Sequence, residues 1–311
     1  MLNDKDINLK SVAVIGAGLM GHGIAQDLAT SQISVKLWDS SQENLTLGLE
    51  NIKKNLVVLG KSHLISDVMN LITPVSSFEE SITEVELVIE AIQEDLTVKL
   101  DLFRDIEKFV SDEVILASNT STFIPSLFAD VLNVPERMLV MHYFNPPYVV
   151  PLVEVVKSRY TSEIVVNKVV ELLKISKKTP VVLNKEMTGF VANRLQSALL
   201  RESIALVNSG VASFDQIDQI VSNSFGQRLA FAGPFKIFDA AGWDVISKIA
   251  QLVWLDLDNS KELPRSIIDL LDCGNLGIKS EKGVFDWDKK SSENFKQMLL
   301  QQLIKINQEY E

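Results

Sequence analysis

The chain of 311 residues contains one cysteine and comparatively little positive charge. Cys273 alone cannot form an internal disulfide, and neither a Cys-x-x-Cys pair nor a cysteine–histidine cluster with metal-ligand spacing occurs. We therefore expect a cytoplasmic protein without a bound metal. Because 41 acidic residues outnumber 30 basic ones, the formal charge is −11. Such a surface repels nucleic acid and anionic membrane, so neither is expected as a partner.

Long apolar segments are also absent from the sequence. No uncharged run approaches the roughly 18–20 apolar residues that cross a bilayer. The first ten residues, MLNDKDINLK, are polar and mixed in charge, so we expect no signal peptide. The shares of apolar residues (46%) and charged residues (23%) are those of ordinary soluble globular proteins. The length exceeds the roughly 100–150 residues of one typical domain, which predicts two domains.

The first half of the chain alternates short apolar runs with longer amphipathic stretches. Glu43–Leu59, for example, repeats leucine and isoleucine at helical spacing. The strand candidates in this half are Ser11–Ile15, Ser34–Trp38, Ile72–Val75, Val85–Ile92, Val114–Ala117 and Met138–Phe144. Strands that alternate with helices predict a parallel sheet covered by helices on both faces.

The second half of the chain becomes mainly helical. It begins with two strands and one helix, at Leu152–Val156, Thr179–Leu183 and Glu163–Ile175. The apolar spacing of Phe190–Asn208 then predicts a largely buried helix. A polar stretch, NKEMTG at 184–189, interrupts the pattern. We place the domain boundary there, with an α/β domain at 1–188 and a smaller all-α domain at 189–311.

A glycine-rich turn joins the first predicted strand to a helix. It reads Gly16-Ala17-Gly18-Leu19-Met20-Gly21, the GxGxxG pattern. The first glycine permits a tight turn, the second lets the backbone approach a pyrophosphate, and the third allows close packing of helix on strand. A turn without a ligand is the alternative, but the strand–turn–helix context favours a Rossmann-type dinucleotide site. Asp39 ends the second strand, where an acid holds the adenosine ribose and repels a 2′-phosphate, so NAD is predicted over NADP.

The candidate for proton transfer is His142, near the end of an apolar strand that a double-proline turn follows. If the returning run pairs antiparallel about Tyr148, His142 and Glu154 lie opposite each other, because residue 148 is their midpoint. Opposed residues have Cβ atoms roughly 4.5–5.5 Å apart. A carboxylate at that distance orients an imidazole and stabilises its charged form. The alternative is a core histidine beside an exposed strand glutamate, and the pairing alone leaves both open.

Two further polar residues are candidates for substrate contact. Ser121 ends the stretch Ser118-Asn119-Thr120-Ser121, which follows a predicted strand. Doubly wound folds bind ligands at the carboxyl ends of such strands. Asn193 lies one turn into the first helix of the second domain. The alternatives are a turn or helix-cap role for Ser121 and a surface or helix-start role for Asn193.

These residues occur in a sequence that resembles the 3-hydroxyacyl-CoA dehydrogenases over nearly its whole length. The matching segments are VIGAGLMGHGIA, AIQEDLTVK, ASNTS, HYFNPP with PLVEVV, TGFVANRLQ, GPFKIFDAAGWD and GIKSEKGVFDW. The resemblance implies an α/β Rossmann-type NAD-binding domain followed by a smaller all-α C-terminal domain, and a homodimer. It makes His142 the acid–base residue and Glu154 its partner, with Ser121 and Asn193 at the substrate carbonyl or hydroxyl. It also places four residues against the NAD cofactor, namely Glu94, Lys99, Asn119 and Asn145.

The resemblance leaves the substrate divided between two classes. The family as a whole implies oxidation of an L-3-hydroxyacyl-CoA, of short chain like 3-hydroxybutyryl-CoA, in fatty acid metabolism. The segments NPPYVVPLVEVV and FGQRLAFAGPF look closer to a branch with lambda-crystallin and L-gulonate 3-dehydrogenase, and L-carnitine dehydrogenases are related. A free 3-hydroxy acid and a catalytically silent NAD-binding protein are therefore alternatives, the second disfavoured by the complete set of four catalytic candidates. Lys53, Lys54 and Lys61 could meet a CoA phosphate or simply form a solvated helix face.

Overall fold

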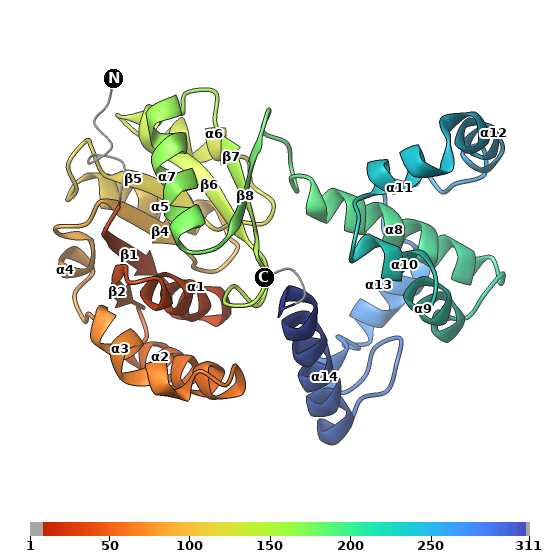
Figure 1. Cartoon of the computed structure of the whole chain (residues 1–311), viewed down its shortest axis with the longest axis horizontal. Coiled ribbons are helices and arrows are strands. Elements are labelled where there is room, and N and C mark those ends of the chain that lie inside the picture. Colours follow the sequence, from red (N-terminus) through yellow and green to blue (C-terminus); the bar gives the residue numbers. More distant parts are fainter. Residues whose placement is uncertain (1–8, 309–311) are drawn as a thin grey trace. The chain divides into compact units, whose positions relative to one another are not determined.

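Eight strands form one sheet in the order β3-β2-β1-β4-β5-β6-β7-β8 (Figure 1). Strands β1 to β6 run parallel, β7 returns antiparallel to β6, and β8 runs parallel to β7. Their bounds are β1 Ser11–Ile15, β2 Ser34–Trp38, β3 Ile72–Pro74, β4 Leu87–Glu90, β5 Ile115–Ser118, β6 Met138–Tyr143, β7 Leu152–Lys157 and β8 Thr179–Leu183. The predicted α/β class with a mainly parallel sheet is confirmed.

The computed structural model describes residues 9–308 of the chain. It divides into two compact units, residues 1–191 and residues 192–311, whereas the sequence places the boundary at 188/189. The expectation of no signal peptide concerns mainly residues 1–8, which lie outside the described range. No helix within that range combines the length and the apolar character needed to cross a membrane.

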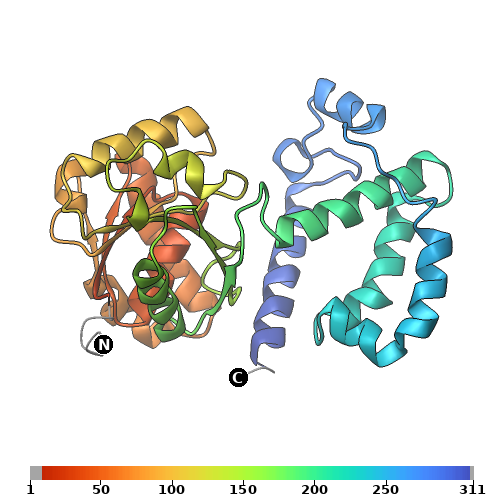
Figure 2. The same cartoon turned by 90° about the horizontal axis from the view of Figure 1, so that it is seen from above.

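Helices cover both faces of the sheet, because alternate strand residues enter two separate cores (Figure 2). In β1, Val12 and Val14 enter one core while Ala13 and Ile15 enter the other. The first core is closed by α1 (Leu19–Thr30), α2 (Gln42–Val58), α3 (Ile65–Leu71) and α7 (Glu163–Ile175). The second is closed by α4 (Phe78–Ile82), α5 (Leu96–Glu107) and α6 (Pro125–Ala129).

Side-chain caps set where several of these helices begin. The side chains of Ser41, Asp95 and Ser162 each accept a hydrogen bond from the backbone N–H three residues further on. These bonds satisfy N–H groups that have no partner within the helix. Helices α2, α5 and α7 therefore start at the residue after each cap.

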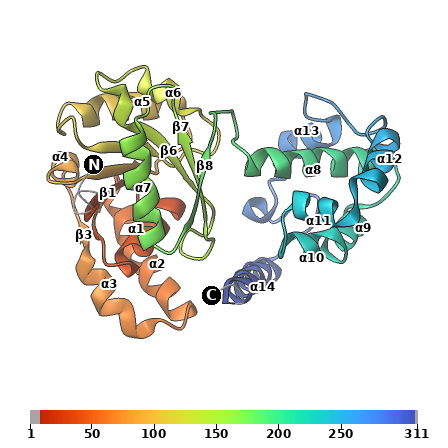
Figure 3. The ribbon, with the colours of Figure 1, turned by 45° about the horizontal axis from the view of Figure 1, so that its top comes forward.

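Within the described residues, the second unit consists of helices and their connections, with two isolated β-bridges and no strand (Figure 3). Its helices are α8 Ala192–Asn208, α9 Phe214–Ser222, α10 Phe225–Leu229, α11 Pro234–Ala241, α12 Trp243–Val253, α13 Arg265–Asp272 and α14 Lys289–Gln308. The predicted all-α second domain is confirmed. The prediction of a largely buried α8 is wrong for the single chain, because no described residue of α8 is buried and Leu195 is 61% exposed. Its apolar spacing marks a stripe that the described residues of the second unit leave exposed.

Candidate active site

The glycine-rich turn lies between β1 and α1, where the strand order reverses from β2-β1 to β1-β4. Doubly wound sheets bind their ligands at this switch point. Gly16 has a φ of +103°, and a Cβ on it would lie 2.6 Å from the carbonyl oxygen of Ala91. A Cβ on Gly21 would lie 1.7 Å from the carbonyl oxygen of Gly16. Both positions need glycine for the turn to form at all.

Gly18 differs from these two glycines, because its missing side chain leaves open space. Apart from Gly18 and its two neighbours in the chain, no described residue has a heavy atom within 4 Å of the position that a Cβ would take. Gly18 is also the N-cap of α1, whose first described turn, beginning Leu19-Met20, has no acidic residue. Open backbone at a helix N-terminus is where a pyrophosphate binds. The residues present therefore fit NAD.

His22 fixes the glycine-rich turn from inside the fold. Its Nδ1–H donates to the carbonyl oxygen of Gly18 at 2.7 Å. Burial lowers the pKa of His22, and the hydrogen bond to Gly18 offsets this only in part. The ring is thus mainly neutral at pH 7.

Asp39 lies directly after β2 and reaches the same turn. One carboxylate oxygen accepts from the N–H of Ala17 at 2.8 Å and the other from the N–H of Ser41 at 2.9 Å. A carboxylate offers about four lone-pair positions, so Asp39 can also accept from the hydroxyls of a ribose. A 2′-phosphate at this place would add a second negative charge, which favours NAD over NADP.

A buried charge network lies at the carboxyl ends of β4 and β5. Lys99 on α5 is 1% exposed, and its ammonium lies 2.5 Å from Glu90 Oε1 and 3.3 Å from Glu94 Oε2. Glu90 also accepts from the Ser118 hydroxyl at 2.5 Å. Burial raises the pKa of Glu90, and the Lys99 charge opposes this shift. No site role for Glu90 or Ser118 was predicted from the sequence. Glu90 is a single acidic residue in a predicted apolar strand and Ser118 begins the polar stretch 118–121, and nothing in the sequence signals that they contact each other.

Glu94 orders the loop that follows β5. It accepts hydrogen bonds from the Thr120 hydroxyl, from the Ser121 N–H at 3.1 Å and from the Thr122 hydroxyl at 2.8 Å. Burial alone would raise the pKa of Glu94, but these hydrogen bonds and the Lys99 charge bring it below its ordinary value. Ser121 itself is exposed. The structure therefore brings together three residues that the sequence predicts for the site, Glu94, Lys99 and Ser121.

Strands β6 and β7 pair antiparallel and place His142 directly opposite Glu154. The predicted register about residue 148 is confirmed. His142 Nδ1 lies 2.9 Å from Glu154 Oε2, and both side chains are buried. Because a carboxylate only accepts hydrogen bonds, Nδ1 carries the proton of this contact, and Nε2 is the ring nitrogen that can act as a base.

Two aromatic rings and a backbone amide fix this pair. The rings of Phe144 and Phe190 lie 4.4 and 5.3 Å from the His142 ring, centroid to centroid. The N–H of Val191 donates to Glu154 Oε1 at 3.1 Å, so each carboxylate oxygen accepts a hydrogen bond. Phe190 has a φ of +51°, a left-handed conformation that bulky residues rarely adopt. The sequence assigns Phe190 and Val191 to the start of a predicted helix, whereas α8 begins at Ala192, so their contacts with His142 and Glu154 were missed.

The other two predicted cofactor contacts lie beside β6. Asn119 is buried, and its side-chain oxygen accepts from the N–H of Tyr143 at 3.0 Å. This bond ties the loop after β5 to β6. Asn145 is exposed on the turn between β6 and β7, and its peptide bond to Pro146 is cis.

The remaining predicted residues lie elsewhere. Lys54 on α2 and Lys61 after that helix are exposed, and the Lys54 ammonium lies 3.5 Å from Glu50. Asn193 is half-buried in the first turn of α8, in the second unit. Contact of Asn193 with the substrate stays a prediction.

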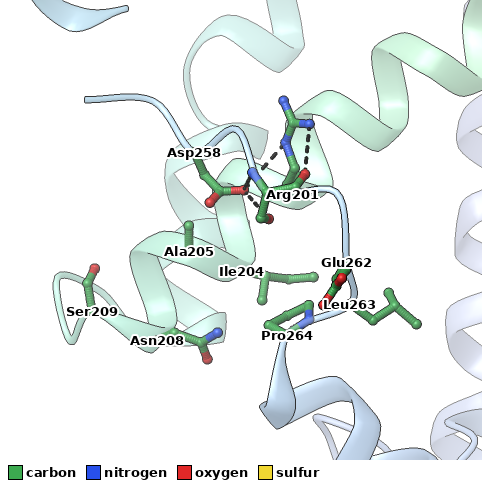
Figure 4. Close-up of a pocket in the computed structure, with 10 residues that line it drawn as sticks. Arg201, Ile204, Ala205, Asn208, Ser209, Asp258, Glu262, Leu263 and Pro264 are labelled. Atoms are coloured by element: carbon green, nitrogen blue, oxygen red, sulfur yellow. Dashed lines mark hydrogen bonds and ion pairs between the residues drawn. The ribbon is translucent and has the colours of Figure 1, made fainter. Parts of the chain in front are cut away.

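The second unit contains a cavity of about 530 Å³ beside α8 (Figure 4). The guanidinium of Arg201 lies 3.5 Å from Asp258 and donates to the Ser260 carbonyl at 3.3 Å. The cavity is lined by Arg201, Ile204, Ala205, Asn208, Ser209, Asp258, Ser260, Glu262, Leu263 and Pro264. None of these is a residue that the sequence predicts for the site, so we do not include the cavity in the candidate active site.

Two family models cover most of the chain. The 3-hydroxyacyl-CoA dehydrogenase NAD-binding domain matches residues 11–187, and the 3-hydroxyacyl-CoA dehydrogenase C-terminal domain matches residues 189–287. The chain belongs to the 3-hydroxyacyl-CoA dehydrogenase family. It is an NAD-dependent oxidoreductase, as the resemblance implies.

Relatives of this dehydrogenase differ in their substrates. A probable 3-hydroxybutyryl-CoA dehydrogenase of Bacillus subtilis is 33% identical over 92% of this chain and 100% of the relative. An L-carnitine dehydrogenase of Oceanobacillus iheyensis is 30% identical over 92% of this chain and 95% of the relative. The crystal structure of 5-formyl-3-hydroxy-2-methylpyridine 4-carboxylic acid 5-dehydrogenase, an NAD⁺-dependent dismutase, has a TM-score of 0.90 and 28% identity over 96% of this chain and 97% of its own.

Proposed function

We propose that this dehydrogenase oxidises the C3 hydroxyl of an L-3-hydroxyacyl-CoA, of short chain like 3-hydroxybutyryl-CoA, to the 3-keto compound. The observation that carries the proposal is the buried contact of His142 with Glu154 at 2.9 Å. A histidine that only fills a core needs one polar partner of any kind. Here the partner is a carboxylate whose second oxygen is itself oriented by the Val191 N–H, which is the arrangement of an acid–base pair.

His142 would act through Nε2, the nitrogen that does not face Glu154. Nε2 takes the hydroxyl proton as the C3–H bond gives up its hydride, and in the reverse direction it returns that proton to the keto oxygen. The Glu154 carboxylate stabilises the imidazolium that forms, and burial of both groups strengthens this attraction. The glycine-rich turn and Asp39 would hold NAD, which would supply the hydride acceptor.

Ser121 and Asn193 would position the substrate oxygen. Four contacts to Glu94, from Thr120, Ser121, Thr122 and Lys99, order the loop that presents the Ser121 hydroxyl. A positioned hydroxyl and amide both stabilise negative charge that develops on the reacting oxygen. This supports a role in both directions of the reaction.

A free 3-hydroxy acid is the second candidate substrate. The observation that favours it is that Lys54, a predicted contact for the CoA phosphates, is paired with Glu50 on the same helix. The net charge of −11 points the same way, because it disfavours a substrate with several phosphate groups unless a basic cluster receives it.

Oxidation of NADH, measured in parallel with acetoacetyl-CoA and with free 3-keto acids, separates the two candidates. We expect kcat/KM to be higher for acetoacetyl-CoA by roughly 100-fold or more, since a site built for a polar group discriminates strongly against its absence. A preference of that size for a free acid contradicts the CoA proposal and supports the second candidate. Binding of NADH without turnover of any of these compounds contradicts both.

We also propose that the enzyme is a homodimer formed through the second unit. In the described part of that unit, α8 to α13 contain no buried residue. Large apolar side chains are exposed instead, among them Phe235 (77%), Trp254 (74%) and Leu255 (83%). Exposed apolar area on this scale is typical of a surface that a partner covers.

A further inference from the structure

A further buried ion pair, between Asp27 and Lys178, lies on the other face of the sheet from His142. Asp27 is on α1, the helix that begins at the nucleotide turn, and Lys178 directly precedes β8. The Lys178 ammonium lies 2.8 Å from Asp27 Oδ1, and the two side chains are 4% and 10% exposed. The reaction proposed above gives neither residue a role.

Lys178 also contacts the turn of the catalytic hairpin. Its ammonium donates to the carbonyl oxygen of Pro147 and, at 3.2 Å, to that of Val150. Both carbonyls belong to the turn that joins β6, with His142, to β7, with Glu154. The same turn carries Asn145, a predicted contact of the cofactor.

Helix α1 touches this turn at a second place, one helical turn before Asp27. A Cβ on Gly23 would lie 2.9 Å from Pro147 Cδ, so helix and turn are in close contact. Helix α1 is therefore connected to the turn of the catalytic hairpin at two places, one helical turn apart. Gly23 contacts the turn directly, and Asp27 is connected to it through Lys178.

Folding stability alone does not explain why Asp27 and Lys178 form a buried ion pair. Removing two charges from water costs free energy, and replacing a buried ion pair by apolar residues of similar volume is often neutral or stabilising. Within residues 9–308, Asp27 Oδ2 and the nearby Tyr143 hydroxyl have no hydrogen-bond partner. An apolar pair would not reproduce the hydrogen bonds that the Lys178 ammonium donates to the carbonyl oxygens of Pro147 and Val150.

We propose that Asp27 and Lys178 are positioning residues, which hold the turn at 145–150 against the nucleotide-binding helix and so fix how His142 and Asn145 meet the bound cofactor. The inference rests on the proposed function for the role of His142. The pair is expected to affect NADH affinity and turnover in addition to any effect on folding.

The same contacts make this clamp, the Asp27–Lys178 pair with its hold on the turn at 145–150, sensitive to pH. Asp27 faces Lys178 and, at longer range, Lys61 after α2, and its charge also acts on Tyr143 of β6. Burial raises the pKa of Asp27 to about 6, with the two lysines opposing the shift. Below about pH 6 Asp27 takes up a proton, Lys178 loses its countercharge, and the turn is held less firmly.

The test compares the double variant Asp27→Leu/Lys178→Met with the wild type. Leucine keeps the branched shape of aspartate and methionine keeps most of the lysine stem, so we expect a melting temperature close to the wild-type value. We expect the Kd for NADH to rise roughly tenfold and kcat to fall roughly 10- to 100-fold, because small displacements of reacting groups carry large kinetic costs. In the wild type the Kd for NADH should rise as the pH falls from 7 to 5, whereas in the double variant it should stay constant.

Arg137→Met is the matched control. Arg137 is also a buried cation in front of a strand, bound to Glu107 and to the Ser111 carbonyl, but it lies at the opposite end of β6 from the turn. The Arg137→Met variant should have a lower melting temperature than the wild type, with the Kd for NADH and kcat unchanged. A double variant that binds NADH and turns over like the wild type, or a wild-type Kd that is constant between pH 5 and 7, overturns the inference. Should the wild type bind NADH but reduce no 3-keto compound, the proposed function fails, while the NADH affinities still decide whether the clamp exists.

Discussion

The described neighbours of the His142 imidazole fix its orientation. Glu154 binds Nδ1, the rings of Phe144 and Phe190 pack against the imidazole plane, and the carboxylate is oriented in turn by the Val191 N–H. Such a ring cannot turn to exchange its nitrogens without breaking a buried hydrogen bond. The single residue is therefore committed to one tautomer, with Nε2 available for the proton.

Replacement of either member of the pair should affect turnover far more than cofactor binding. We expect His142→Gln to lower kcat by ~10²–10⁴-fold, the usual contribution of a general acid–base group. Glu154→Gln should also lower kcat, because an amide can orient the ring but cannot stabilise its positive charge. The Kd for NADH should change little in both variants, since the nucleotide turn at Gly16–Gly21 is a separate part of the site.

Melting temperature measured beside kcat tests the alternative of a core histidine. That alternative expects lost stability with near-normal turnover in whatever protein stays folded. A His142→Gln variant that melts like the wild type and keeps most of its turnover contradicts the assignment.

At the scale of single elements, the sequence could predict what depends on neighbours in the chain. The His142–Glu154 register was accessible because a short turn with two prolines connects the strands, which fixes their midpoint at residue 148. The contacts of Glu90 with Ser118 and of Asp27 with Lys178 were not accessible. Their partners come from distant segments, and only the order of the strands in the sheet brings them together.

The turn between β1 and α1 allows a prediction that separates folding from binding. Gly18→Ala adds a Cβ that meets no described heavy atom within 4 Å outside residues 17–19, so the melting temperature should stay close to the wild-type value. The same Cβ occupies the side from which a pyrophosphate approaches, and we expect the Kd for NADH to rise by roughly tenfold or more.

Gly233→Ala is the control for this variant. Gly233 is likewise the N-cap of a helix, α11, with a φ of −66° like that of Gly18 and open space around its Cβ position among the described residues. It should change neither the melting temperature nor the affinity for NADH. Equal effects of both variants on the Kd would show that Gly18 has no special role.

For the whole molecule, the two units differ in how they bury apolar residues. The first unit has two continuous cores on either side of its sheet. In the described part of the second unit, the apolar stripe of α8 and the side chains of α11 and α12 lie largely at the surface. Sequence periodicity could not foresee this difference, because an apolar stripe has the same spacing whether its own chain or a partner covers it.

A second copy of the chain is the partner that would complete the second unit. A stable dimer interface removes about 1,200–2,000 Å² of surface from water, and the exposed apolar residues of α8 to α12 supply a surface for it. We expect light scattering at micromolar concentration to give twice the mass of one chain, and Trp254→Glu to shift the mass toward the monomer, because a buried unpaired charge is costly at an interface. Val58→Glu, at an exposed valine of α2, should leave the mass unchanged. A monomeric mass for the wild type under these conditions contradicts the proposal, and it would mean that the exposed apolar surface of the second unit serves another partner.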